Sequence, residues 1–211
     1  MIELKELKKN ISLLKTYVIA ALAAVILALF IRVFIIEAYR IPTSVMEPTL
    51  LAGDIIFATK GSYGVRLPGS ITPIIEGRPP KYSEVVIYSP MSNPNIYHIR
   101  RVIGLAGDSI ELKEGVVYLN QKPLKYAASG NCGQEWHQEN AYSVCMDKNS
   151  SFPLTQVPEG HVLVLSDQRR NLSKLGELVP FSSLRARALF VWLSISPEKG
   201  FMWNRMFSFI K

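Results

Sequence analysis

A long apolar segment near the N-terminus dominates the hydrophobic pattern of the chain. Residues 16–31 carry no charge, and residues 33–36 extend the segment beyond the single charge of Arg32. About 20 residues in helical conformation span the hydrocarbon core of a bilayer, and an arginine near the end of such a helix can extend its charge to the headgroups. The pattern predicts a transmembrane helix over residues 15–36, preceded by a short segment, 1–14, and followed by a larger domain, 37–211.

A cleaved secretory leader is the alternative to an anchor, because both begin with a basic segment followed by an apolar one. The apolar segment here is longer than the roughly 7–15 residues of a leader's core, and bulky Phe34, Ile35 and Ile36 stand where small residues would precede a cleavage site. We therefore expect an uncleaved anchor.

The charges before the anchor predict its orientation. Four lysines precede the apolar segment: Lys5, Lys8, Lys9 and Lys15. The positive-inside rule then places residues 1–14 in the cytoplasm and residues 37–211 on the other side of the membrane.

After residue 37 the pattern changes to short segments that are rich in β-branched residues and bounded by Gly, Pro, Asn or Asp. Six of them are predicted as strands: residues 54–58, 84–88, 109–112, 116–119, 161–165 and 188–194. No long amphipathic helical repeat follows residue 37, so the fold class is mainly β with one N-terminal helix. Residues 68–80, rich in Pro and Gly, are expected to form a surface loop. Residues 201–211 mix aromatic and basic side chains, which fits either an interfacial membrane contact or a segment packed on the core.

Composition and charge restrict the chemistry. Cys132 and Cys145 lie in a polar stretch, residues 129–146, that is expected to be a loop. A disulfide between them would close a ring of about 14 residues, which an oxidising compartment favours. No Cys/His spacing typical of a metal site occurs, and neither a metal nor a cofactor is predicted. The net charge is +7, but the basic residues are scattered and no nucleic-acid-binding motif accompanies them, so we expect contact with anionic membrane lipid and no nucleic acid.

Four segments, in order and at similar spacing, resemble the conserved motifs of the bacterial type I signal peptidase (leader peptidase) family. They are residues 41–50 (IPTSVMEPTL), 84–90 (EVVIYSP), 100–108 (RRVIGLAGD) and 157–160 (VPEG) leading to 166–171 (SDQRRN). The resemblance implies a signal-peptidase-like antiparallel β domain on the outer side of the bacterial cytoplasmic (inner) membrane, which is periplasmic in a Gram-negative cell. It also implies a hydrolase of the serine protease family that removes leader peptides in protein secretion, with a serine nucleophile and a lysine general base.

The resemblance places residues without that chemistry at both catalytic positions. Val45 stands at the nucleophile position and has no nucleophilic atom. Arg100 stands at the general-base position, and a guanidinium does not lose its proton in proteins. Supporting positions also differ, since Leu172 replaces a serine that orients the lysine, Lys174 replaces an aspartate and Ser166 replaces a glycine.

Other family features are retained. Thr43 keeps the hydroxyl that the family places near its oxyanion hole. The resemblance further implies a shallow apolar groove in which a leader peptide lies as an added strand. The matching positions that would line it are Ile41, Pro42, Met46, Leu50 and Ile99.

We therefore expect an inactive relative, a pseudoenzyme that binds leader peptides of exported or pilin-like proteins and releases them uncut. The rival is an active signal peptidase with a rearranged site, in which Ser44 is the nucleophile and His98, two residues before Arg100 and on the same strand face, is the base. A third hypothesis is a purely structural membrane protein. His137 and His161 are expected to be structural, and the sequence leaves the oligomeric state open.

Overall fold

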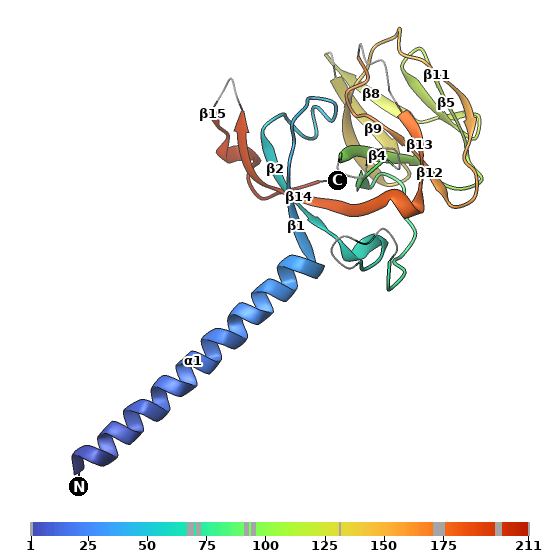
Figure 1. Ribbon diagram of the computed structural model, residues 1–211. Coiled ribbons are helices and arrows are strands. Elements are labelled where there is room, and N and C mark those ends of the chain that lie inside the picture. The colour runs from blue at the N-terminus through green and yellow to red at the C-terminus, as the bar shows by residue number, and fades with distance from the viewer. Residues whose placement is uncertain are drawn as a thin grey trace.

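Helix α1 (Ile2–Phe34) extends away from a body of β-strands and carries the N-terminus at its far end (Figure 1). This computed structural model describes residues 2–66, 70, 73–90, 93, 96–130, 132–170, 176–196 and 200–210, with side chains from residue 13 onward. Three positions of the fourth motif discussed above therefore lie outside the described residues: Asn171, Leu172 and Lys174.

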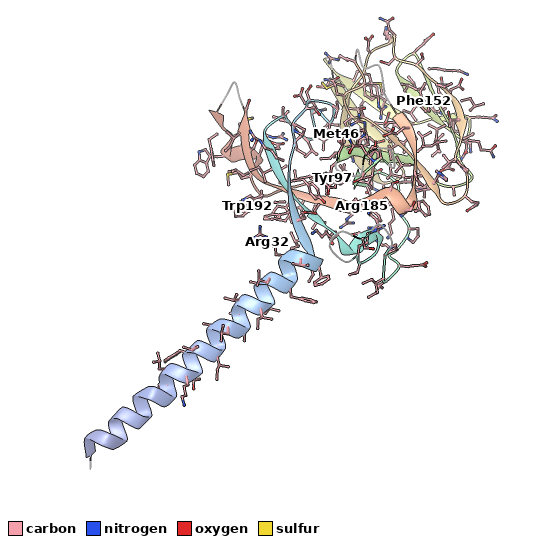
Figure 2. All side chains as sticks on the ribbon, in the orientation of Figure 1. Arg32, Met46, Tyr97, Phe152, Arg185 and Trp192 are labelled. Atoms are coloured by element: carbon pink, nitrogen blue, oxygen red, sulfur yellow. A yellow bond between two sulfur atoms is a disulfide. The ribbon has the colours of Figure 1, made fainter. Side chains whose placement is uncertain are left out.

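The apolar part of α1, Leu13–Phe34, has a mean hydropathy of 2.6, and none of it is buried against the rest of the protein. Figure 2 shows its side chains free of the β body, with Arg32 at the end nearest the body. The helix ends at Phe34, two residues before the end of the expected span, because Ile35 accepts a hydrogen bond from the Lys60 N–H and strand β1 begins at Ile36. This length and apolarity suit a membrane-crossing helix.

The main sheet is antiparallel throughout and follows the order β1, β2, β14, β3, β4, β12, β13. Its strands are β1 (Ile36–Arg40), β2 (Asp54–Thr59), β14 (Leu184–Ser196), β3 (Val85–Tyr88), β4 (His98–Gly104), β12 (His161–Leu165) and β13 (Gly176–Pro180). Two short strands pair with β14: β15 (Gly200–Phe201) and β16 (Ser208–Phe209).

Two smaller sheets lie on the side of the body away from β15 (Figure 1). One contains β10 (Asn140–Cys145), β9 (Cys132–His137) and β8 (Lys125–Ser129). The other contains β11 (Phe152–Gln156), β5 (Ser109–Lys113), β6 (Val116–Leu119) and β7 (Lys122–Pro123). Short 3-10 turns occur at Gly61–Tyr63, Phe181–Ser183 and Trp203–Arg205.

The prediction of a mainly β fold with one N-terminal helix is confirmed. All six predicted strands are present, as β2, β3, β5, β6, β12 and part of β14. The expected disulfide is also present, and it joins Cys132 to Cys145. The loop expected over residues 129–146 is wrong, because most of these residues form the paired strands β9 and β10, in which the two cysteines lie opposite each other.

The main sheet has a separate hydrophobic core on each face near β3. Along β3, Val85 and Ile87 point to one face and Val86 and Tyr88 point to the other, as alternation in a strand requires. We call the cluster on one face the first core: Ile41, Met46, Leu50, Ile56, Ala58, Val85, Ile87, Ile99, Ala186, Ala188 and Val191. The cluster on the other face is the second core: Tyr63, Val86, Tyr88, Val102, Val162, Val164, Val179 and Leu184.

The C-terminal segment both packs on the body and exposes aromatic rings. Ile210 packs against the first core, and Arg205 is 2.8 Å from the buried carboxylate of Asp54. Trp203 and Phe209, however, are 74% and 80% exposed. Together with three exposed neighbours they form what we call the aromatic face: Trp192, Phe201, Trp203, Phe207 and Phe209. Trp192 is labelled in Figure 2.

Candidate functional site

The first motif forms a loop, residues 41–50, that connects β1 to β2 and folds over the first core. The Ile41 N–H donates to the Asp54 carbonyl at 2.8 Å, which ties the beginning of the loop to β2. Met46 and Leu50 are fully buried and anchor its second half. The loop therefore holds a short exposed segment on a fixed base.

The residues expected to bind a leader peptide divide into two groups. Ile41, Met46, Leu50 and Ile99 belong to the first core, whereas Pro42 is exposed. The four buried side chains support the loop from beneath. Pro42 and the two residues that follow it form the exposed surface of the loop.

The positions that the resemblance connects with catalysis come directly after Pro42. Thr43 and Ser44 are exposed, and Val45 is half-buried against the first core. The Ser44 carbonyl accepts a hydrogen bond from the Glu47 N–H at 3.0 Å, and the Val45 carbonyl accepts one from the Gln168 N–H at 3.1 Å. Val45 thus lies where the first and fourth motifs meet, and it brings only methyl groups to that junction.

A buried charge network holds the first, third and fourth motifs together. Arg101 donates to both carboxylate oxygens of Asp167, at 2.8 and 2.6 Å, and to the Ser83 carbonyl at 2.7 Å. The Thr49 hydroxyl donates to the same carboxylate at 2.6 Å. Arg101 and Asp167 are 0% exposed, and the guanidinium lies 4.2 Å from the ring centroid of Tyr142. The sequence reasoning missed this network, although Arg101 and Asp167 both lie within the quoted motifs.

A second buried ion pair extends the network into the β9–β10 hairpin. Arg169 donates to the two oxygens of Glu135 at 2.7 and 2.8 Å, and the Tyr142 hydroxyl donates to Glu135 at 2.6 Å. Burial alone raises the pKa of the Glu135 carboxyl, but the Arg169 charge and these hydrogen bonds outweigh it and hold the pKa below its usual value. The Arg169 N–H also donates to the Cys145 carbonyl at 2.8 Å, so the disulfide-bonded hairpin supports the fourth motif directly.

Strand pairing places Arg100 and Val45 on opposite faces of the main sheet. Ile99 belongs to the first core, against which Val45 packs. Arg100 lies directly opposite Val86 of β3, and Val86 belongs to the second core. Residues opposite each other in an antiparallel pair share a face. The Arg100 side chain therefore leaves the backbone on the face of the second core, and Val45 lies on the other face.

His98 shares the face of Arg100, and its contacts are with β3 and β13. Its Nδ1 atom is 3.5 Å from the Glu177 carboxylate, and its ring packs edge-on against Tyr88 with a centroid distance of 5.5 Å. The Tyr88 hydroxyl donates to the same carboxylate. Burial, reinforced by this hydrogen bond, raises the pKa of Tyr88. The structure thus brings His98 together with Glu177, a residue that the sequence reasoning did not single out.

Two unpaired strand edges flank the loop. Within the described residues, β12 pairs with β4 only from Arg101 onward, so residues 98–100 have no partner strand on the side away from β3. Strand β1 pairs only with β2 and has its other edge free in the described part of the chain. The rings of Tyr39 and Tyr97 meet between these strands at a centroid distance of 5.5 Å.

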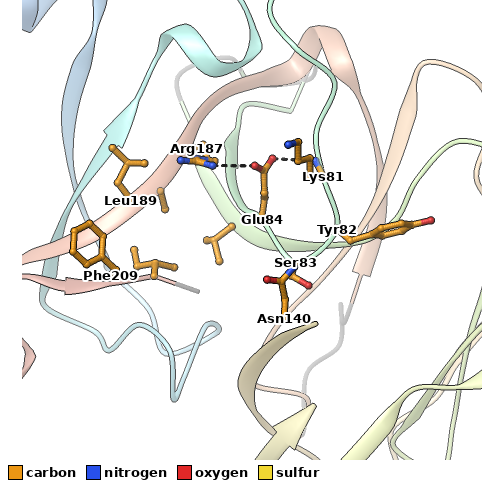
Figure 3. A pocket seen from close by; sticks show the side chains of 11 residues that line it. Lys81, Tyr82, Ser83, Glu84, Asn140, Arg187, Leu189 and Phe209 are labelled. Atoms are coloured by element: carbon orange, nitrogen blue, oxygen red, sulfur yellow. Dashed lines mark hydrogen bonds and ion pairs between the residues drawn. The ribbon is translucent and has the colours of Figure 1, made fainter. Parts of the chain in front are cut away.

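A cavity of about 360 Å³ lies elsewhere on the sheet, where β16 approaches the start of β3 (Figure 3). Figure 3 shows the Glu84 carboxylate between Arg187 and Lys81 on one side of it, with Phe209 and Leu189 on the other. The guanidinium of Arg187 is 3.1 Å from Glu84. The lining includes none of the residues that the resemblance connects with catalysis.

His137 is a buried histidine outside the loop region. Its side chain is 1% exposed, its ring centroid is 4.1 Å from that of Tyr82, and neither ring nitrogen has a hydrogen-bond partner among the residues that the structure describes. Burial lowers the pKa of His137, and the charges of Glu135 and Asp108 oppose this only in part. Among the described residues, no group of three His, Cys, Asp or Glu side chains is arranged to hold a metal ion.

A mainly β domain thus follows one apolar helix, and the first, third and fourth motifs meet at a single loop. The family described as "Signal peptidase, peptidase S26" matches residues 14–193, and the chain belongs to that family.

Similar proteins include signal peptidase I of Rickettsia akari and of Rickettsia felis, each 30% identical over 200 residues. Both alignments cover 80% of this chain and 75% of the relative. The crystal structure of a signal peptidase I from Enterococcus faecalis V583 matches with a TM-score of 0.35 and 20% identity, and the match covers 52% of this chain and 97% of that one.

Proposed function

We propose that this chain is a membrane-anchored member of the signal peptidase family that binds leader peptides of exported proteins, including pilin-like ones, and does not cleave them. The single observation that carries the proposal is Val45, at the junction of the first and fourth motifs. Acyl transfer requires a nucleophilic atom at that junction, and a valine side chain has none. The residue at the position of the general base, Arg100, is a guanidinium and not an amine, and it lies on the opposite face of the sheet from Val45.

The retained scaffold supports peptide binding in the absence of chemistry. The buried network around Arg101 and Asp167 ties the loop 41–50 to the third and fourth motifs through Thr49. The two unpaired strand edges offer backbone N–H and C=O groups to an extended peptide, which is the mode of binding by strand addition. Pro42 is exposed and Val45 is half-buried on the loop that follows β1, so both can contact small apolar side chains of the peptide.

The helix and the aromatic face support a placement at the membrane. We propose that residues 15–36 cross the membrane with residues 1–14 in the cytoplasm and the β domain outside. Strand β1 continues directly from the helix, and Trp192 of the aromatic face contacts Phe57 of the adjacent strand β2. Exposed tryptophan and phenylalanine side chains favour the headgroup region of a bilayer, so this face supports a domain that lies close to the membrane surface.

An active site built on Ser44 and His98 is the second candidate. The observation in its favour is the carboxylate of Glu177 near Nδ1 of His98, since a histidine held in this way by a carboxylate can act as a base through Nε2. Its weakness is that His98 and Val45 lie on opposite faces of the sheet, which separates the base from the loop that carries Ser44.

Photo-crosslinking tests the binding proposal. The full chain, purified in detergent, is mixed with a precursor protein. The leader of this precursor ends in two small residues separated by one residue of any type, and it carries a photoreactive group at this end. We expect a crosslink to the wild type that Val45→Trp abolishes, because the larger indole at this half-buried position would cover the neighbouring exposed part of the loop. Val116→Trp is the matched control, since Val116 is equally half-buried but lies in β6. If no crosslink forms, or if both variants behave alike, the structural hypothesis replaces this one.

A further inference from the structure

The hydrogen-bonding direction of β4 shows which backbone groups lie at its free edge. The Val102 N–H donates to the Glu84 carbonyl and the Ser83 N–H donates to the Val102 carbonyl, each at 2.9 Å. Val102 therefore directs its backbone groups toward β3. Alternate residues of an antiparallel strand direct theirs to the same side, so the N–H and C=O of Ile99 point the other way, toward the edge that β12 does not cover.

The side chain of Arg100 already occupies part of this edge. Its Nη1 atom donates to the Ile99 carbonyl at 2.8 Å. A guanidinium donates a stronger hydrogen bond than a neutral amide, because the donor is charged. The carbonyl that an added peptide strand would use is therefore satisfied by the protein's own arginine.

We propose that Arg100 is an edge cap that controls peptide binding: its guanidinium competes with a leader-peptide N–H for the Ile99 carbonyl, and a peptide enters the edge only by displacing it. This inference rests on the proposed function, because it concerns the same strand edge. It assigns the arginine at the family's general-base position a role in setting affinity and in releasing peptides.

Binding of a fluorescent leader-derived peptide to the full chain in detergent, followed by fluorescence polarisation, tests the proposal. Arg100→Met keeps the length of the side chain but has no donor, and we expect it to bind the peptide about tenfold more tightly, which corresponds to about 1.4 kcal/mol. Arg100→Lys keeps a charged donor and should change the affinity by less. Lys122→Met removes one positive charge from an exposed position in β7 and should leave the affinity unchanged.

Peptides methylated at one backbone nitrogen at a time identify the competing group. One of these peptides should bind Arg100→Met no more tightly than it binds the wild type, because methylation removes the N–H that would donate to the Ile99 carbonyl. Equal or weaker binding by Arg100→Met, with the wild type binding, overturns the edge cap and leaves the proposed function standing. The absence of binding by both proteins, with circular dichroism showing both folded, overturns the proposed function and the edge cap together.

Discussion

The buried pair of Arg101 and Asp167 provides the strongest stability prediction. Arg101→Met removes three hydrogen bonds of 2.6–2.8 Å to Asp167 and Ser83 and the stacking over Tyr142. It also leaves the Asp167 carboxylate at 0% exposure, with the Thr49 hydroxyl as its partner among the bonds described above. A buried charge that loses its counter-ion destabilises a protein by about 3–5 kcal/mol.

Replacing both members of the pair should cost less than the two single losses combined. Asp167→Leu alone leaves the Arg101 charge buried, whereas the double variant Arg101→Met/Asp167→Leu removes both charges of this pair. We therefore expect each single variant to lose about 3–5 kcal/mol of unfolding free energy, and the double variant to be more stable than either. For a domain of this size, such a loss lowers the Tm by about 10 °C.

Urea and thermal unfolding of the full chain in detergent, followed by circular dichroism, measure these losses. Lys113→Met is the control, because Lys113 forms an exposed ion pair with Glu111 and its loss should change stability by less than about 1 kcal/mol. The reasoning is refuted if the single variants unfold like the wild type. It is also refuted if their losses simply add in the double variant.

Three further predictions follow from other parts of the molecule. Because burial lowers the pKa of His137, the folded protein binds this proton at lower pH than the unfolded chain does, so stability is full above about pH 6.5 and falls as the pH drops below it. His137→Phe should therefore reduce the change of the urea unfolding midpoint between pH 7 and pH 5, and an unchanged pH dependence of the midpoint contradicts this. The double variant Cys132→Ser/Cys145→Ser should lose about 3 kcal/mol of unfolding free energy. Urea unfolding, with the reduced wild type measured beside it, tests this, and an unaltered urea midpoint would show that the disulfide does not stabilise the hairpin. Trp203→Ser with Phe209→Ser should raise the exposure of the domain's tryptophans to an aqueous quencher in vesicles, and equal quenching would place the aromatic face away from the lipid.

The hydrophobic pattern predicted the fold class because apolar segments of strand length were bounded by turn residues. It failed for β4 (HIRRVIG), in which two consecutive arginines interrupt the apolar alternation. Arg101 is nevertheless fully buried, because Asp167 supplies its counter-ion from 66 residues further along the chain. A local pattern cannot show such a partner.

The candidate site was predictable only in part for a similar reason. The motifs identified the loop and the positions of Val45 and Arg100, but which face each side chain occupies depends on strand pairing. The same pairing buries Ile41 and Ile99 in the first core. It also leaves the Ile99 carbonyl at an open edge, where the Arg100 guanidinium caps it.

Cleavage of a leader-bearing precursor by the purified full chain, followed by mass spectrometry, tests the central claim most directly. We expect no product from the wild type, and no change with Ser44→Ala or His98→Ala, because Val45 brings no nucleophilic atom to the junction of the motifs. Product at a defined leader boundary that either substitution abolishes would contradict the claim and show that the chain is an active peptidase with a rearranged site.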